Sequence, residues 1–255
     1  MRKIDIKKQK ERIVEFIRSY THDAGFKKGI IGLSGGLDSS VSAYLSTEAL
    51  GKENVIGAIL PYKTTSITCI RDAELVIQRL GIKSYTRDIS PIVDSYFATY
   101  EENATSLRRG NFMARVRMCV LYDLSAKEQA LVIGTGNKTE LYLGYVTQFG
   151  DSACALEPIG HLYKTEVREL AKLLGLPKQI IEKIPSADLW QGQTDEGELG
   201  ITYEKADEIL YRLVDEKLTE DEMVKQGFDY KDVQHVKKLI KNSQFKRRLP
   251  AMLED

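Results

Sequence analysis

The chain contains no apolar run that approaches the roughly 20 residues of a membrane-spanning helix, and it has no net charge, since Lys plus Arg and Asp plus Glu both number 37. Without a charge bias, the composition favours neither nucleic acid nor an anionic membrane as a partner. The three cysteines, Cys69, Cys119 and Cys154, are far apart, which argues against a disulfide framework and against a Cys-x-x-Cys pair. We therefore expect structural cysteines and a cytoplasmic protein with no nucleic-acid or membrane partner.

What the chain does have is an alternation of apolar strands and amphipathic helices. Its 255 residues are enough for a sizeable core, and we expect one domain spanning residues 1–255. The first half predicts, in order, a helix at 5–20, a strand at 29–33, a helix at 37–50, a strand at 55–60, a helix at 67–80 and a strand at 82–89. This order is typical of an α/β fold with a doubly wound parallel sheet and helices on both faces.

The second half of the chain predicts one more strand and a helical C-terminal part. The expected elements are a short helix from Pro91 to Glu101, a helix at 111–126, a strand at 130–134, a helix around 167–174, a long loop at 185–200, and helices at 203–213, 220–225 and 231–241. Thr219 and Glu222 form the capping box of the penultimate helix. A loop as long as 185–200 usually closes over a site or is disordered, and Trp190 within it could cover a site.

The stretch from Ile30 to Ser40 is the strongest candidate for a binding site. An apolar strand ends there in Ser34, Gly35 and Gly36, and a helix begins near Leu37. The glycines allow a sharp turn and a close approach by a ligand, while the free N–H groups at the helix start suit an anionic phosphate. Neither the Walker A spacing nor the dinucleotide fingerprint is present. An ordinary strand-to-helix turn is the alternative interpretation.

The run Ser34 to Ser39 resembles the pyrophosphatase loop of the N-type ATP pyrophosphatases, which split ATP between its α and β phosphates. Further blocks make nearly the whole chain resemble the ammonia-dependent NAD synthetases of that superfamily. These blocks are residues 108–118, 134–140, 149–151, 162–165, 185–189 and 245–250.

The resemblance implies an adenine nucleotide alpha hydrolase-like fold and a ligase reaction in two steps. The carboxylate of nicotinic acid adenine dinucleotide (deamido-NAD) attacks the α-phosphate of ATP and releases pyrophosphate, and ammonia then converts the acyl adenylate into NAD and AMP. Adenylation is needed because a carboxylate by itself has no good leaving group. The roughly 30 residues before the loop leave no room for a glutaminase, so we expect free ammonia as the nitrogen donor.

The resemblance also assigns roles to individual residues, with Asp38 and Lys164 as the catalytic pair. Asp38 and Glu140 correspond to the ligands of Mg²⁺, whose other positions phosphates and water would fill. Lys164 corresponds to a mobile cation on the phosphates. The ATP contacts correspond to Gly32, Leu33, Ser34, Gly35, Gly36, Leu37, Asp38, Ser39, Thr135, Lys164 and Ser186, and the deamido-NAD contacts to Arg115 and Lys246.

The chain departs from the family pattern at two substrate-binding positions, which carry Gln148 and Ala155 here. On the helix predicted at 111–126, Arg115 and Arg117 are two residues apart and point in different directions, so at most one should face the ligand from this chain, and we favour Arg115. The family also implies a homodimer, with residues 91–128 as the expected interface.

Other functions fit the loop as well. A tRNA thiolation enzyme would call for paired cysteines, which the chain lacks, and a GMP-type amination enzyme would prefer a purine nucleotide acid. A pure adenine-nucleotide sensor would bind ATP without forming pyrophosphate or AMP. A substrate panel with AMP detection distinguishes these functions.

Overall fold

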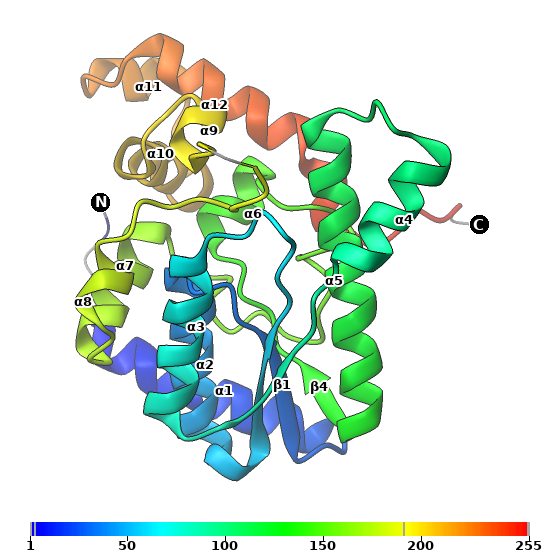
Figure 1. Cartoon of the computed structure of the whole chain (residues 1–255). Coiled ribbons are helices and arrows are strands. Elements are labelled where there is room, and N and C mark those ends of the chain that lie inside the picture. The colour runs from blue at the N-terminus through cyan, green and yellow to red at the C-terminus, as the bar shows by residue number, and fades with distance from the viewer. Residues whose placement is uncertain (1, 3, 191, 254–255) are drawn as a thin grey trace.

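A computed structural model of the chain describes residue 2, residues 4–190 and residues 192–253. The ends of the expected domain and position 191 of the predicted loop lie outside the described residues. A parallel sheet in the order β3-β2-β1-β4 lies at the centre of the fold (Figure 1). Its strands are β1 (Lys28–Gly32), β2 (Val55–Ile59), β3 (Lys83–Thr86) and β4 (Ala130–Val132).

Alternate residues of the strands point to opposite sides of the sheet, and both sides carry apolar side chains. Helices therefore cover each face. Ile31 points into one apolar core, which α1 (Ile6–Asp23), α2 (Leu37–Leu50), α3 (Ile67–Leu80) and α7 (Lys164–Leu173) complete. Ile30 points into a second core with α4 (Ser90–Tyr100) and α5 (Ser106–Glu128). The predicted α/β fold with a doubly wound parallel sheet is therefore confirmed.

The bounds of α2 and α3 agree with the prediction, because glycines stop both helices. Gly81 ends α3 in the left-handed conformation, at φ 63°, and its N–H donates to Ile77 O. In contrast, α5 begins five residues before the predicted Asn111. The Thr105 hydroxyl accepts a hydrogen bond from the Arg108 N–H and caps the helix there, so the polar residues before Asn111 belong to the helix and not to a loop.

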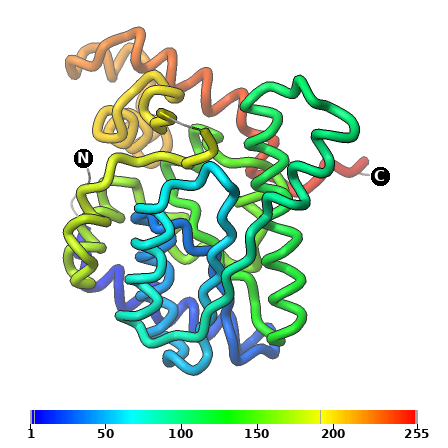
Figure 2. Tube along the Cα trace, in the orientation of Figure 1, coloured from blue at the N-terminus to red at the C-terminus, as the bar shows by residue number. Residues whose placement is uncertain are grey.

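The C-terminal part is helical, as predicted, and its helices between residues 195 and 242 lie at one end of the molecule (Figures 1 and 2). Its elements are α8 (Lys178–Ile181), α9 (Asp195–Leu199), α10 (Tyr203–Leu210), a π-helical turn (Tyr211–Asp215), α11 (Glu220–Lys225), α12 (Tyr230–Asn242) and a 3-10 turn (Gln244–Arg247). The capping box of α11 is confirmed.

Three helices of this half were missed in the sequence, one of which is α8 with only four residues. Another, α9, lies inside the predicted 185–200 loop, where the Thr194 side chain caps it and Gly200 ends it. The third, α6 (Lys138–Leu143), directly follows β4 and the loop at Thr135. α10 and α12 both pack against α6, which forms a third apolar core. No helix within the described ranges has both the length and the apolar character needed to cross a membrane.

Candidate active site

The loop after β1 is shaped to receive an anion at the start of α2. The first N–H groups of α2 have no intrahelical partners, and the N-cap residue, Gly36, has no side chain that could cap them. Gly36 N donates to Ser34 Oγ at 3.2 Å, and Ser34 Oγ lies 3.1 Å from Ser39 Oγ. The two hydroxyls thus line the turn beside the positive end of the helix dipole, which suits a phosphate group.

A clamp from two other segments holds this loop in place. Gly35 has φ +75°, and a Cβ added there would lie 2.0 Å from the backbone oxygen of Cys69 in α3. Lys183, which follows α8, donates to Gly35 O at 3.2 Å and to the buried carboxylate of Asp72 at 2.8 Å. Only glycine therefore fits at position 35. Sequence reasoning missed Lys183 and Asp72, because no local pattern places them beside the loop.

Next to the loop, two carboxylates converge on one buried ammonium group. Lys164 Nζ lies 2.6 Å from Asp38 Oδ2 and 2.9 Å from Glu140 Oε1, and only 4% of the Lys164 side chain is exposed. Burial by itself would lower the pKa of Lys164, but the two carboxylates raise it, so the ammonium stays charged. Burial also raises the pKa of Glu140. The structure thus brings together three of the predicted site residues from α2, α6 and α7.

Asn137 organises this cluster from the start of α6. Its Oδ1 accepts the Glu140 N–H at 3.0 Å, which forms a capping box, and its Nδ2 donates to Asp38 Oδ1 at 2.9 Å. The Lys164 N–H donates to Thr139 Oγ1 at 2.9 Å, which ties α7 to the same turn. The capping pattern Asn137-x-x-Glu140 was present in the sequence, and it would have predicted α6.

The donor set of this cluster fits the predicted magnesium ion. Asp38 and Glu140 offer hard carboxylate oxygens, and in the structure they already hold one cation, the Lys164 ammonium, between them. The described residues provide no group of three His, Cys, Asp or Glu side chains that could hold a metal alone. Mg²⁺ bound by these two carboxylates would therefore need phosphate oxygens and water as further ligands.

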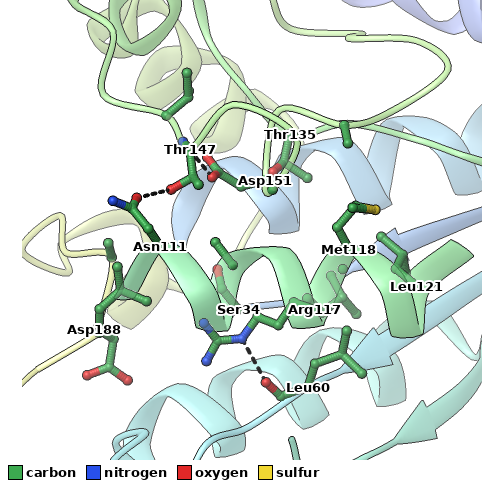
Figure 3. A pocket seen from close by; sticks show the side chains of 18 of the residues that line it. Ser34, Leu60, Asn111, Arg117, Met118, Leu121, Thr135, Thr147, Asp151 and Asp188 are labelled. Atoms are coloured by element: carbon green, nitrogen blue, oxygen red, sulfur yellow. Dashed lines mark hydrogen bonds between the residues drawn. The ribbon is translucent and has the colours of Figure 1, made fainter. Parts of the chain in front are cut away.

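A cavity of about 580 Å³ opens beside the loop at the carboxyl ends of the strands (Figure 3). Gly32, Leu33 and Ser34 lie on one side of it, and Thr135 borders it after β4. The apolar wall of the cavity is formed by residues that include Leu60, Ile70, Met118, Leu121 and Val132. The segment after Pro185 also reaches the cavity with Ala187, Asp188, Leu189, Trp190 and Gln193.

Of three further predicted residues, Lys246 lines this cavity, whereas Ser186 and Arg115 do not. Lys246 lines it, and its Nζ donates to Gly144 O and Val146 O, both at 2.8 Å. The Ser186 hydroxyl does not line it but donates to Gln193 O at 2.7 Å, across the segment that contains Trp190. Arg115 is exposed and donates to Gln148 O at 3.3 Å, outside the cavity lining. Its neighbour on α5, Arg117, lines the cavity instead.

The loop after α6 also lines the cavity. Asp151 Oδ1 accepts the Thr147 N–H at 2.8 Å, and Thr147 Oγ1 donates to Asn111 Oδ1 at 3.0 Å, which fastens the loop to α5. Burial raises the pKa of Asp151. Ala155 packs against the apolar core.

Taken together, the parallel sheet, the anion-binding loop after β1 and the adjoining cavity define an α/β enzyme that binds a phosphate-bearing nucleotide at a helix start. The sequence profile of the NAD synthase family matches residues 9–250. The chain therefore belongs to the NAD synthase family, and the predicted resemblance is confirmed.

Individual relatives agree with this assignment over their whole lengths. The NH(3)-dependent NAD(+) synthetase of Fusobacterium nucleatum is 50% identical over 254 residues, which is 99% of this chain and 98% of the relative. The structure of the NH3-dependent NAD synthetase from Campylobacter jejuni, in complex with the nitrate ion, is 35% identical with a TM-score of 0.84, covering 99% of this chain and 100% of the other. The structure of NMN synthetase from Francisella tularensis covers the same shares at 33% identity, with a TM-score of 0.88.

Proposed function

We propose that this chain is a carbon-nitrogen ligase that uses ATP and ammonia to convert deamido-NAD into NAD, with AMP and pyrophosphate as the other products. The observation that carries the proposal is that the Ser34–Ser39 loop borders the cavity at Ser34. The same loop carries Asp38, whose carboxylate meets the Lys164 ammonium together with Glu140. The names of relatives that match this chain from end to end support the same reaction.

In the first step, the chain has to place ATP for attack by the substrate carboxylate and neutralise the pyrophosphate that departs. The N–H groups at the start of α2 and the hydroxyls of Ser34 and Ser39 would hold the pyrophosphate. Lys164 lies next to them and would turn from its carboxylate partners to the phosphates. Mg²⁺, when held by Asp38 and Glu140, would supply a counter-charge to the phosphate oxygens.

In the second step, ammonia attacks the carbonyl carbon of the acyl adenylate, and AMP leaves. The Thr147–Asp151 loop and the segment with Trp190 both border the cavity and would exclude water, which otherwise competes with ammonia for the activated carbonyl. The apolar wall with Met118 and Leu121 would hold the adenine ring. Arg115 and Lys246 remain our candidates for contacts with the acid substrate, Lys246 from the cavity wall and Arg115 from outside it.

A second acid substrate has to be considered, because one similar structure is an NMN synthetase. Such an enzyme would take the mononucleotide form of the acid, which lacks the adenylate half of deamido-NAD. The two substrates share the reacting carboxylate, so the cluster around Lys164 serves both equally. We favour the dinucleotide because the curated relative with 50% identity is an NAD(+) synthetase.

The purified chain can be tested with ATP, Mg²⁺ and ammonium together with deamido-NAD or nicotinic acid mononucleotide, following the amide product and AMP. We expect NAD and AMP in equal amounts, with a higher kcat/KM for the dinucleotide. A higher kcat/KM for the mononucleotide would reverse the substrate assignment. Equal turnover with glutamine in place of ammonium would contradict ammonia as the donor, and the absence of AMP with every acid would favour a sensor.

We also propose a homodimer in which α4 and the start of α5 form the interface. Large apolar side chains are exposed there: Ile92, Tyr96, Tyr100 and Leu107, of which Tyr100 is 73% exposed and Leu107 63% exposed. Arg115 lies on the outer surface of the same helix and could reach a substrate bound at the interface. A monomeric mass at micromolar concentration would contradict the dimer. A Tyr100→Glu and Leu107→Glu double variant should dissociate it, whereas Phe16→Glu on α1 should not.

Two further expectations belong to the same proposal. The chain would act as one synthetase unit, since the cavity is lined by residues from the sheet, from α5 and from the segment after Pro185. We also expect the chain to lie in the cytoplasm, because ATP and the dinucleotide would be available there. Fractionation of cells that express the tagged chain tests the location.

A further inference from the structure

The Arg117 side chain has no role in the reaction as described so far, although it lines the cavity. Its Nε donates to the backbone oxygen of Leu60, at the carboxyl end of β2, at 2.9 Å (Figure 3). Among the described residues, neither Nη1 nor Nη2 of Arg117 has a hydrogen-bond partner. The backbone contact therefore fixes the plane of the guanidinium and leaves up to four N–H donors unused.

No carboxylate in the described part of the chain forms an ion pair with this guanidinium. The two acids that influence it, Asp188 and Asp151, are engaged elsewhere: Asp188 Oδ2 accepts the Ser66 N–H at 2.9 Å, and Asp151 Oδ1 accepts the Thr147 N–H. Burial lowers the pKa of Arg117, so the protein environment alone does not favour its charge. A partly buried cation with free, oriented donors is costly unless a ligand supplies the anion.

The position of Arg117 on α5 indicates which part of a ligand it would contact. Ala114 and Leu121 lie one turn before and one turn after it, on the same helix face, and all three line the cavity. The face thus presents a small residue, a cation and an apolar residue in sequence. Ser34, at the phosphate loop, borders the same cavity (Figure 3). Arg117 therefore lines the same cavity as the apolar residues and the loop.

A bound ATP would place different groups against these surfaces. With adenine on the apolar wall at Met118 and Leu121, and with the β and γ phosphates at the Ser34–Ser39 loop, the α-phosphate comes between them. The α-phosphate keeps a negative charge in both steps, first as the group under attack and then as part of the departing AMP. Two parallel N–H donors match two of its oxygens in a bidentate contact, which arginine makes and lysine does not.

We propose that Arg117 is a further catalytic residue, which binds the α-phosphate of the nucleotide through its two Nη groups in both steps of the reaction. This role rests on the proposed function, since it requires an adenine nucleotide in the cavity. It differs from the role of Lys164, whose ammonium is held by Asp38 and Glu140 and serves the pyrophosphate that departs in the first step only. It also distinguishes Arg117 from Arg115, which lies outside the cavity lining.

The test compares two ligands that differ only in the phosphate: AMP and adenosine. Their affinities for the full chain are measured by calorimetry for the wild type, Arg117→Gln and Arg117→Lys, with Arg79→Gln on the exposed surface of α3 as the matched control. We expect Arg117→Gln to weaken AMP binding about 10-fold to 100-fold and to leave adenosine binding within about twofold. Arg117→Lys keeps the charge without the fork and should recover only part of the loss. Arg79→Gln should bind both ligands as the wild type does.

Two results would overturn the role of Arg117. One is unchanged AMP affinity in Arg117→Gln, and the other is an equal loss of AMP and adenosine affinity in both Arg117 variants, which would indicate a merely structural role. If the wild type makes NAD and AMP while Arg117→Gln binds AMP normally, only this assignment fails. If the wild type neither binds AMP nor forms it with any acid, the proposed function fails as well.

Discussion

The substitution Gly35→Ala tests whether the phosphate loop has room for any side chain at its turn. Gly35 has φ +75°, a backbone conformation that L residues rarely adopt. The added Cβ would also lie 2.0 Å from Cys69 O and 2.9 Å from Cys69 C. Both atoms belong to the backbone at the start of α3, which cannot move aside as a flexible side chain would. The loop itself must therefore shift.

The expected cost has two parts that can be separated. The positive φ by itself costs about 1–2 kcal/mol for alanine. Relief of the contact with Cys69 has to displace the loop by more than about 1 Å, and forced overpacking of this kind costs about 1–3 kcal/mol more. The shift would also move Gly35 O away from Lys183, which now donates to it at 3.2 Å.

Gly25→Ala provides the matched control. Gly25 has φ +80°, but nothing lies within 4 Å of an added Cβ, so only the conformational cost applies. For a chain of this length, thermal unfolding should fall by about 2–4 °C per kcal/mol. We expect Gly25→Ala to be fully active and modestly less stable. Gly35→Ala should lose at least about twice as much stability, and its kcat/KM for ATP should fall by about tenfold or more, because the N–H groups that hold pyrophosphate are displaced.

The measurements are thermal unfolding without ligand and steady-state kinetics at varied ATP. The reasoning is refuted if both variants unfold at the same temperature and Gly35→Ala retains the wild-type kcat/KM for ATP. A loss of stability in Gly35→Ala with unchanged kinetics would show that the loop does not hold the phosphates.

Three further predictions concern the buried charges. Asp38→Asn should keep the fold and lower magnesium-dependent pyrophosphate release by about 100-fold or more, because it removes a charged ligand at constant volume; release at the wild-type rate would exclude the role. Lys164→Ala leaves Asp38 and Glu140 facing each other without a cation, so we expect the free energy of unfolding to fall by about 3–5 kcal/mol. We also expect the variant to lose nearly all single-turnover adenylation. Normal adenylation would show that Lys164 does not belong to the site. Burial raises the pKa of Glu157 to about 7 from 4.5. The folded state therefore holds this proton more tightly than the unfolded state, and stability falls as pH rises from about 4.5 to 7, by at most about 3 kcal/mol. Glu157→Gln keeps an acceptor for the Gly136 N–H, now 2.8 Å from Glu157 Oε2, and should abolish this loss. Denaturant titrations at pH 5 and pH 8 measure the free energy of unfolding of both proteins. If it changed by the same amount between the two pH values in the wild type and in Glu157→Gln, the prediction would be contradicted.

Much of the fold was predictable because the signals that define it are local. The helices α2 and α3 have their predicted bounds, since the apolar pattern and the terminal glycines lie within each segment. Local signals failed where a cap was overlooked: Thr105 extends α5 toward the N-terminus, and the capping box at Asn137 creates α6. The predicted loop contains α9 because five residues are too short for a periodic pattern to emerge.

In the candidate site too, the features that local sequence defines were predictable, and those that depend on distant contacts were not. The sequence by itself determined the phosphate loop, because glycines, serines and a helix start within ten residues are enough to build an anion-binding turn. Through its resemblance to the family, the sequence also predicted a site with Asp38, Glu140 and Lys164. Their meeting around one ammonium group depends on the pairing of β1 with β4, which brings the starts of α2 and α6 together. The hydrogen bond from Lys164 N–H to Thr139 Oγ1 adds the start of α7.

Only the tertiary structure decided which arginine of α5 faces the cavity and what holds the loop in place. Helical spacing shows that Arg115 and Arg117 point in different directions, but not which direction is inward, because that depends on how α5 packs on β1 and β4. The hydrogen bond from Arg117 to Leu60 O and the clamp of Lys183 and Asp72 on Gly35 join residues more than 50 positions apart. Such contacts leave no periodic signal in the sequence, since they arise only when separate elements pack against each other.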